Sequence, residues 1–424
     1  MIFSSIGFLI FFSIFVLLIK FFSNYQKHII IILSLFFYSY WDPIFFLLIF
    51  YLLITTFYII KKKISLKIAI PIILLPLFYF KYSSFIFGLI SIDIFEKFSY
   101  YGSLPLAISF ITFTVIALIV DITSNEFNEE LTFTNFAEFI IFFPQLIAGP
   151  ILRAKELIPQ LRNNIIFKKD NIRFGILLFL IGFIKKVFLA DNISLFIDPF
   201  FQNPELYSSK DLIKGYLLFP FQIYFDFSGY VDMALGCALM LNIILPINFN
   251  SPYKAHNVIH FWKKWHITLA EFLMNYIYYP LLRSLPNISF PLVMLVTIIV
   301  FFLAGLWHGP SWMFIAFGLI HGIGVVFNHC KEKFFNFKIY LPLSIFLTFN
   351  YVNLSFVFFR SENFDQAFII ISKMLNFSSF KILLTENVFQ DLILSKNLTL
   401  LAISILIVFV FKNSDYLANS KHLK

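Results

Sequence analysis

The sequence predicts an all-α polytopic membrane protein. Only 13% of its 424 residues are charged, and 60% are hydrophobic. A soluble domain carries about 25% charged residues, so most of the surface of this chain cannot face water. A bilayer-spanning helix needs about 20 mostly apolar residues, and runs close to that length recur along the chain. The net charge of +9 comes from basic residues in the loops between these runs, a pattern typical of cytoplasmic loops. We therefore expect lipid contact and no nucleic-acid partner.

The apolar runs predict about eleven transmembrane or re-entrant helices, some of them broken, in a single integral membrane domain over residues 1–424. The first run has no basic residue before it and no small-residue cleavage site after it, so we expect a retained span and not a signal peptide. Segment 84–98 is ambiguous. The runs lie near 2–19, 29–41, 44–60, 66–80, 104–120, 137–152, 174–190, 212–246, 291–308, 311–328, 340–358 and 398–411.

The basic loops predict the orientation of these segments. If segment 254–285 enters the membrane without crossing it, all the loops can be cytoplasmic, with the amino terminus and the stretch 359–397 outside. This count places His308 near the outer end of its segment and His266 near the cytoplasmic side. One of the two segments must then be broken or tilted if the histidines are to meet. The loops are Lys61–Lys63, Arg153 to Arg173, Lys254 to Lys264, Lys331 to Lys338, and the tail with Lys421 and Lys424.

His308 stands in the stretch FFLAGLWHGPSW, after seventeen residues without a charge. Ionisable groups in membrane segments are costly and usually face a cavity or a partner. Gly309 and Pro310 break a helix at this point, which favours a cavity lining. A neutral imidazole can accept a proton from an alcohol near pH 7 and later release it. The alternative is a histidine that a single hydrogen bond satisfies at a helix end.

Segment 253–283, YKAHNVIHFWKKWHITLAEFLMNYIYYPLLR, is amphipathic and aromatic. One interpretation is an interfacial helix, with Trp262 and Trp265 at the headgroups and Lys263 and Lys264 extending toward water. That interpretation leaves His266 unexplained, because a histidine on an apolar face needs a polar task.

A metal site is not expected. His256 and His260 are four residues apart and share a helix face, whereas His266 would face elsewhere at about 100° per residue. No Glu follows His256 to complete an HExxH motif. Cys237 and Cys330 match no ligand spacing, and we expect them to be small buried hydrophobes.

Intramembrane carboxylates suggest another chemistry, a proton relay. Asp226 and Asp232 lie in FPFQIYFDFSGYVDMALG together with Ser228, and Asp121 ends an earlier run. A proton-coupled transporter would need such groups in series with histidines. Structural pairing of each carboxylate with a lysine or a backbone donor is the alternative.

Five stretches of the chain, which follow one another in the order typical of the family, resemble the bacterial branch of the membrane-bound O-acyltransferase (MBOAT) family. That branch includes alginate and peptidoglycan O-acetylation proteins and the teichoic-acid D-alanyl transfer protein. The resemblance covers residues 100–325 as a core, with flanking membrane helices in 1–99 and 326–424. The stretches are SLPLAISFITFTVIALIVDI (103–122), FFPQLIAGPILRAKELIPQL (142–161), FDFSGYVDMALG (225–236), HFWKKWHITLAEFLMNYIYYPL (260–281) and GLWHGPSWMFIAFGLIHG (305–322).

The resemblance implies helices around a central funnel and tunnel, with His308 of the WHG motif and His266 of the FW-x-x-WH motif as catalytic residues. The family often has Arg-Asp where this chain has Met274-Asn275, so no acid is assigned there. Further expectations divide into two groups. The substrate-tunnel candidates are Trp307, Trp262, Trp265, Asp226 and Ser228, with membrane packing as the alternative role of the tryptophans. The candidates for the phosphates of coenzyme A are Lys263, Lys264 and Arg153, with ordinary positive-inside residues as the alternative.

The leading hypothesis is therefore O-acetyl transfer in a bacterial cytoplasmic (inner) membrane, without a bound cofactor. Acetyl-CoA would be the donor, and a cell-wall or exported polysaccharide such as peptidoglycan or alginate would be the final acceptor. An extracytoplasmic transferase or esterase-like protein would be the partner that passes the acetyl group on. Two alternatives stay open: D-alanyl transfer from a carrier protein to a teichoic-acid-type polymer, and a proton-coupled transporter. Against the transporter, no pair of matching broken segments occurs in two halves of the chain.

Overall fold

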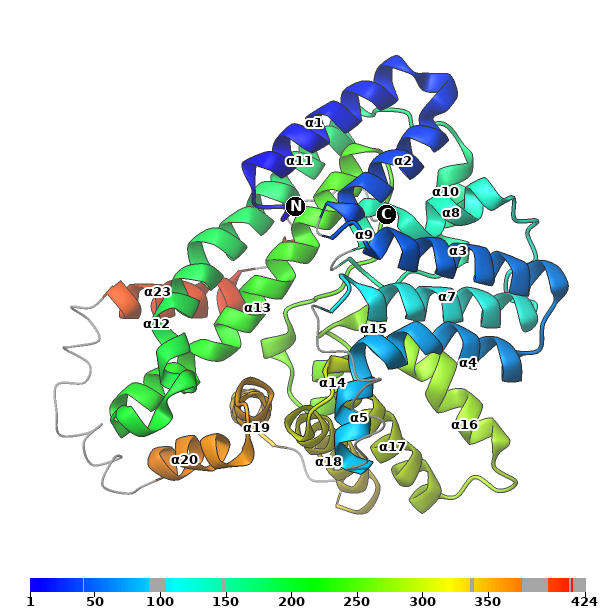
Figure 1. The fold of residues 1–424 in the computed structure, drawn as a ribbon. Helices are drawn as coiled ribbons and strands as arrows, with labels where there is room; N and C mark the ends of the chain where they lie inside the picture. Colours follow the sequence, from blue (N-terminus) through cyan, green and yellow to red (C-terminus); the bar gives the residue numbers. More distant parts are fainter. Residues whose placement is uncertain are drawn as a thin grey trace. The chain divides into compact units, whose positions relative to one another are not determined.

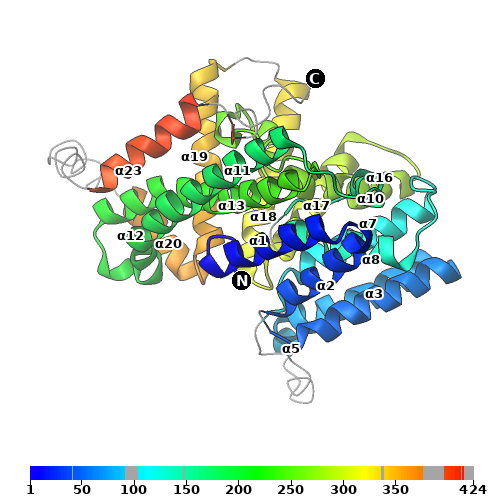
Figure 2. The same cartoon turned by 90° about the horizontal axis from the view of Figure 1, so that it is seen from above.

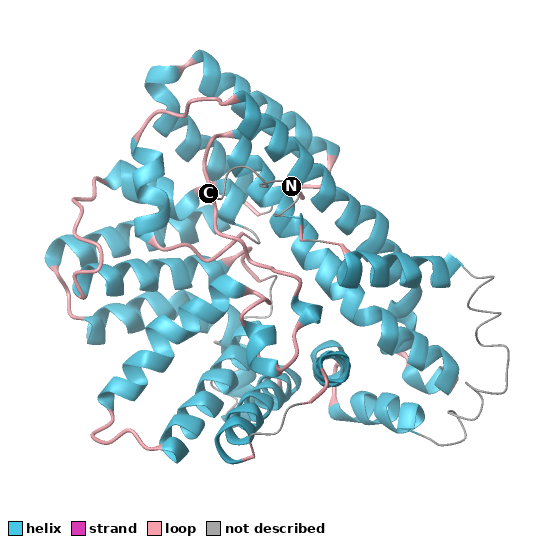
Figure 3. Cartoon of the chain, turned by 180° about the vertical axis from the view of Figure 1, so that it is seen from behind, coloured by secondary structure: helices cyan, strands magenta, loops and turns pink. Residues whose placement is uncertain are grey.

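The computed structural model describes residues 1–40, 42–90, 104–146, 149–335, 339–375, 396–411 and 413–414. Within these ranges every regular element is a helix, and a single isolated β-bridge pairs Phe249 with Trp265 (Figure 3). The predicted all-α class is thereby confirmed. Parts of the predicted segments 84–98 and 359–397, and the basic tail with Lys421 and Lys424, lie outside the described residues.

The helices fall into two compact units. Unit 1 holds Met1–Gly182 and Tyr230–Ile247, and unit 2 holds Phe183–Gly229 and Asn248–Ser420. The long helix α13 (Ser209–Met240) begins in unit 2 and ends in unit 1. The single domain over 1–424 and the core over 100–325 stay predictions.

Unit 1 is a bundle in which α2 packs along α8 (Figures 1 and 2) and α4 packs along α7 (Figure 1). Rings fill its core: Phe8, Phe37 and Phe143 are at most 1% exposed, and their centroids lie 5.4, 5.9 and 6.2 Å apart. Large offset or tilted rings of this kind bury much apolar area. Its helices are α1 (Ile6–Phe21), α2 (Gln26–Ser39), α3 (Phe45–Lys62), α4 (Leu66–Leu77), the π-helix η2 (Phe78–Tyr82), α5 (Ser83–Ile90), α7 (Ile108–Thr123), α8 (Phe133–Ile141), α9 (Phe143–Leu146), α10 (Ala154–Arg162) and α11 (Lys169–Phe183), with the short 3₁₀-helix η1 (Ser23–Tyr25).

Unit 2 contains the motif-bearing helices, and α17 and α18 are its most extensively packed pair (Figure 1). Its α-helices are α12 (Asp191–Gln202), the first part of α13, α14 (Val258–Trp262), α15 (Ile267–Leu273), α16 (Tyr279–Ser284), α17 (Phe290–His308), α18 (Trp312–Phe334), α19 (Leu341–Arg360), α20 (Phe364–Leu375) and α23 (Lys396–Ile405). Its π- and 3₁₀-helices are η3 (Ile184–Ala190), η4 (Pro204–Leu206), η5 (Pro252–Lys254), η6 (Met274–Tyr278) and η7 (Leu406–Val410).

Glycine lets α17 and α18 approach closely. A Cβ atom on Gly318 would lie 2.3 Å from the carbonyl oxygen of Phe301, and one on Gly305 would lie 2.3 Å from the carbonyl oxygen of Phe314. Small residues at such crossings allow backbone-to-backbone packing in membranes. This contact fixes the end of α17, which carries His308, against the start of α18.

Five helices of the described part are long and apolar enough to cross a membrane, or six if the bent pair at the start counts as one span. The protein is therefore a multi-pass membrane protein. The first apolar run forms α1, which ends at Phe21 after 16 residues, and the chain bends by 106° between α1 and the next helix. The count of about eleven segments, the central funnel and the tunnel stay predictions.

Candidate active site

The carboxyl end of α17 places His308. The uncharged run 291–307 forms this helix, and the chain leaves it at Gly309 in an extended conformation, followed by Pro310, which has no N–H to continue a helix. The side chain of His308 is half-buried. Its ring meets Phe317 and Phe359 edge-on, at centroid distances of 5.4 and 5.2 Å. His308 is thus held among aromatic rings at a helix end.

His266 lies at a break between two short helices. Its backbone has φ 45° and ψ 52°, the left-handed conformation, and it precedes α15 as the N-cap. Such a conformation costs a non-glycine residue about 1 kcal/mol. Two backbone hydrogen bonds offset this cost, because the Asn250 N–H donates to Lys264 O at 2.9 Å and the Ile267 N–H donates to Asn248 O at 3.0 Å. The interpretation of segment 253–283 as one interfacial helix is therefore wrong.

Asn248 determines which nitrogen of His266 carries the proton. Its Oδ1 accepts hydrogen bonds from the backbone N–H and the hydroxyl of Thr268, at 3.1 and 3.0 Å. A backbone N–H can only donate, so this atom is the amide oxygen. The His266 Nδ1 lies 3.3 Å from the same oxygen and must donate to it. The lone pair of the ring is consequently on Nε2.

The pKa of His266 supports a neutral ring. Its side chain is 0% exposed. Burial lowers the pKa of this imidazole well below its usual value, and the nearby His308 lowers it further. His266 is thus uncharged at physiological pH.

Trp307 brings the two histidines together. The Trp307 ring meets His266 at 5.6 Å and His308 at 4.9 Å, both edge-on. Phe227 of α13 closes another side of His266 at 4.8 Å. The chain is broken at His266 itself, as expected if the two histidines are to approach each other, whereas their depths in the membrane stay predictions. Two imidazoles of different burial beside one indole can hold and move a proton.

Trp262 and Trp265 are packed inside the protein, at 7% and 4% exposure. The Trp262 Nε1–H donates to Nδ1 of His321 at 3.2 Å. Trp265 stacks on Phe261 at 5.6 Å. Neither ring is available to contact lipid headgroups, since both are buried in the core around the break. Their role in a tunnel stays a prediction.

Asp226 and Ser228 of α13 flank Phe227 but do not share its contact with His266. The Asp226 carboxylate forms an ion pair with Lys186 at 2.5 Å, and Lys186 also binds Asp191 at 2.7 Å. Pairing with a lysine, the structural alternative for this carboxylate, is confirmed. Ser228 is buried, and its hydroxyl has no hydrogen-bond partner among the described residues.

Lys263 and Lys264 follow α14 in a basic segment. Lys263 is exposed and Lys264 is half-buried. Beside them the Nδ1 atoms of His256 and His260 lie 2.8 Å apart. Burial lowers the pKa of His260 to about 4, with further contributions from Lys264, His256 and Lys263. The segment is electropositive, which suits an anion.

A metal centre is not assembled in the described part of the chain, where no group of three or more His, Cys, Asp or Glu side chains is placed to hold an ion. Of the two cysteines, Cys237 is buried and Cys330 is half-buried.

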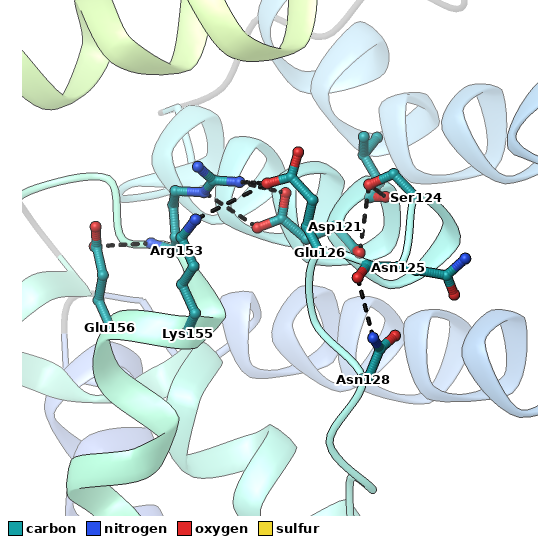
Figure 4. A network of polar contacts seen from close by, with 9 residues as sticks. Asp121, Ser124, Asn125, Glu126, Asn128, Arg153, Lys155 and Glu156 are labelled. Carbon is teal, nitrogen blue, oxygen red and sulfur yellow. Dashed lines mark hydrogen bonds and ion pairs between the residues drawn. The ribbon is translucent and has the colours of Figure 1, made fainter.

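Arg153 lies in unit 1 and is engaged by acids (Figure 4). Its guanidinium binds both carboxylate oxygens of Asp121, at 2.9 and 3.2 Å, and Glu126 at 2.6 Å. Its backbone N–H donates to Glu156 at the start of α10, at 3.3 Å. Asp121 is 1% exposed. The arginine therefore compensates a buried carboxylate, so Asp121 has a structural partner, although this partner is an arginine and not the expected lysine or backbone donor.

Sequence reasoning assigned no role to three residues of the site, Asn248, His321 and Ser355, although His321 was among the five candidate histidines. Asn248 stands in an ordinary polar loop signal, INFNSPY, and its partner Thr268 lies 20 residues away. His321 was visible as an intramembrane histidine in GLIHG, but its partners come from two other helices.

Comparison with known proteins places these residues in a family. The model of the MBOAT, membrane-bound O-acyltransferase family matches residues 122–360, which include both histidines. The chain is 37% identical to the peptidoglycan O-acetyltransferase of Helicobacter pylori, over 81% of this chain and 73% of that protein. It is 33% identical to the probable alginate O-acetylase AlgI of Pseudomonas aeruginosa, over 72% of this chain and 59% of that protein. It is 28% identical to the teichoic acid D-alanyltransferase of Bacillus subtilis, over 62% of this chain and 70% of that protein. This chain belongs to the membrane-bound O-acyltransferase family and is an acyltransferase.

Proposed function

We propose that this protein transfers an acetyl group from cytoplasmic acetyl-CoA across a bacterial inner membrane for O-acetylation of a cell-wall or exported polysaccharide. The names of the relatives support the acyl group and the acceptor class, because the H. pylori protein is named a peptidoglycan O-acetyltransferase and the P. aeruginosa protein a probable alginate O-acetylase. Family membership speaks against the transporter alternative. The observation that carries the proposal is the meeting of His266 and His308 at Trp307.

His308 is the general base in this proposal. It accepts the proton of the acceptor hydroxyl as the hydroxyl oxygen attacks the thioester carbonyl carbon. The carbon–sulfur bond then breaks, the thiolate of coenzyme A takes up a proton, and an O-acetyl ester remains. Positioned proton transfer of this kind contributes roughly 10²–10⁴ in rate. The partial exposure of His308 supports its assignment, because the base must reach a substrate, whereas His266 is fully buried.

His266 is the second catalytic or orienting histidine. Its Nδ1–H is committed to Asn248, so its Nε2 lone pair can receive a hydrogen bond from a protonated or polar neighbour. A neutral ring beside His308 does not repel the imidazolium that forms when His308 takes a proton. His266 therefore stabilises or orients the base.

The donor phosphates would be bound by Lys263 and Lys264. Lys263 and Lys264 lie in the electropositive segment, three and two residues before His266. Attraction between a basic segment and an anionic donor raises the local concentration of the donor. Arg153 fits this role less well, since its charge is already matched by Asp121 and Glu126. An extracytoplasmic transferase or esterase-like protein would accept the acetyl group and pass it to the polymer.

Purified protein in lipid nanodiscs, with radiolabelled acetyl-CoA and a soluble polysaccharide acceptor or the partner protein, tests the proposal. We expect His308→Ala to abolish transfer and His266→Ala to reduce it severely, with normal membrane insertion. His329→Ala on α18 is the matched control and should retain full transfer. Retained transfer by His308→Ala would remove this residue from the mechanism. Transfer from a D-alanyl carrier protein, and none from acetyl-CoA, would establish the D-alanyl alternative instead.

A further inference from the structure

A buried polar cluster lies behind the active site in unit 2. It consists of His321 on α18, Trp262 on α14 and Ser355 on α19, with exposed fractions of 0%, 7% and 0%. Buried polar groups are normally hydrogen-bonded, and here each polar side-chain group of the cluster has a partner inside it or in the backbone. The cluster joins three helices that carry parts of the active site.

The hydrogen bonds leave His321 only one tautomer. The Ser355 hydroxyl donates to Val352 O at 2.6 Å, so its oxygen accepts from the ring Nε2–H at 2.8 Å. The Trp262 Nε1–H can only donate, and it does so to Nδ1 at 3.2 Å. His321 is thus neutral, protonated on Nε2, and its single lone pair is occupied. A second proton on Nδ1 would face the indole N–H.

Ring contacts connect this cluster to His308, and the chain itself connects it to His266. Phe317 meets His321 edge-on at 4.7 Å and His308 edge-on at 5.4 Å. On α19, one turn beyond Ser355, Phe359 meets His308 at 5.2 Å. On the α14 side, Trp262 lies four residues before His266. His321 therefore ties the segment of His266 to the rings that hold His308.

We infer that His321 is a positioning residue of the acyl transfer. Its neutral ring, bound by Trp262 and Ser355, has two effects: it fixes the placement of His308 and His266, and it offers no competing site for the proton. The second effect follows because the lone pair on His321 Nδ1 already accepts a hydrogen bond from Trp262. His321 therefore cannot take the proton that His308 must accept. The catalytic consequence of this inference rests on the proposed function, whereas the tautomer of His321 rests only on its hydrogen bonds.

The tautomer is measurable without turnover. Nitrogen-15 NMR of histidine-labelled protein in nanodiscs, assigned by comparison with His321→Gln, should show a ring protonated on Nε2 only, from pH 8 down to pH 6. The Trp262→Phe variant should change the Nδ1 signal, because the donor to that atom is lost. A ring protonated on Nδ1, or on both nitrogens at pH 7, would overturn the inference even in a protein whose transfer activity is normal.

Kinetics separate positioning from packing. The double variant His321→Phe/Trp262→Phe replaces both partners by apolar rings, so no buried donor is left unpaired. The single variant Trp262→Phe is its matched control. We expect the double variant to keep the thermal transition of the control while kcat falls a further 10- to 100-fold, with KM for acetyl-CoA within about twofold. Equal kcat in the two variants would refute a positioning role.

Two further variants keep the inference open to refutation if the double variant does not fold. Ser355→Ala removes the acceptor of the Nε2–H and should lower kcat without changing KM; an unchanged kcat counts against the inference. His321→Gln can restore a donor toward Ser355 and should recover more kcat than His321→Ala, whereas equal activity of the two argues for packing alone. If the wild-type protein transfers no acetyl group at all, the proposed function fails, and the NMR result still decides the tautomer.

Discussion

The close approach of α17 and α18 predicts that Gly318→Ala damages the active site from a distance. The added Cβ would lie 2.3 Å from Phe301 O and 2.9 Å from the backbone of Gly305, where ordinary contact begins at 3.4 Å. Backbone atoms cannot turn away as a side chain can, so the two helices must separate by about 1 Å. Overpacking of this kind costs about 1–3 kcal/mol of stability.

The same displacement moves His308 on α17 relative to Phe317, the neighbour of Gly318 on α18. Because a misplacement of about 1 Å can cost about 100-fold in rate, we expect kcat for acetyl transfer to fall by about that factor. Thermal unfolding and transfer kinetics in nanodiscs measure the two effects. Gly88→Ala on α5 is the control, since a Cβ there has nothing within 4 Å. Wild-type kcat and stability in Gly318→Ala would show that the helices are not in backbone contact.

Three further predictions concern the polar side chains. Asn248→Ala removes the acceptor shared by Thr268 and His266. The temperature of the thermal transition and kcat should therefore both fall, with a loss of about 1–3 kcal/mol in stability. Asn248→Asp keeps an oxygen at this position and should recover part of the stability and part of kcat. The pKa of His266 in the folded protein lies well below the ordinary value of 6.5, so the unfolded chain binds more protons below pH 6.5. The free energy of unfolding should therefore fall as pH drops below 6.5, by up to about 1.4 kcal/mol per pH unit. Denaturation in micelles measures this pH dependence, which should be absent from His266→Gln. Arg153→Lys loses the two-point contact with buried Asp121, so the thermal transition should fall while KM for acetyl-CoA stays within about twofold; a raised KM with unchanged stability would instead make Arg153 a donor ligand.

Sequence pattern predicts the long helices well because their signals are local. The run 291–308 corresponds closely to α17, Phe290–His308, since its ends carry their own signals: proline near the start and Gly-Pro after the end. His308 could be singled out for the same reason, as a titratable group at the end of an uncharged run.

The break at His266 could not be predicted in the same way. Histidine is no turn signal, and the apolar periodicity of 253–283 runs through it. What stabilises the left-handed residue is long-range: Asn248 pairs with Ile267 and Thr268, 19 and 20 residues later. Arg153 is a similar case, because its role depends on Asp121, 32 residues earlier on another helix. Period-based reasoning sees neither partner.

The difference in burial between the two histidines bears on how they divide the chemistry. A general base must meet the hydroxyl it deprotonates, and only His308 is partly exposed. His266 is enclosed by Phe227, Trp307 and the Asn248 hydrogen bond, so its ring cannot reorient without breaking that bond. Exchanging the roles would require the enclosed ring of His266 to reach the substrate. The geometry thus favours a mobile proton on His308 and fixed neutral rings around it.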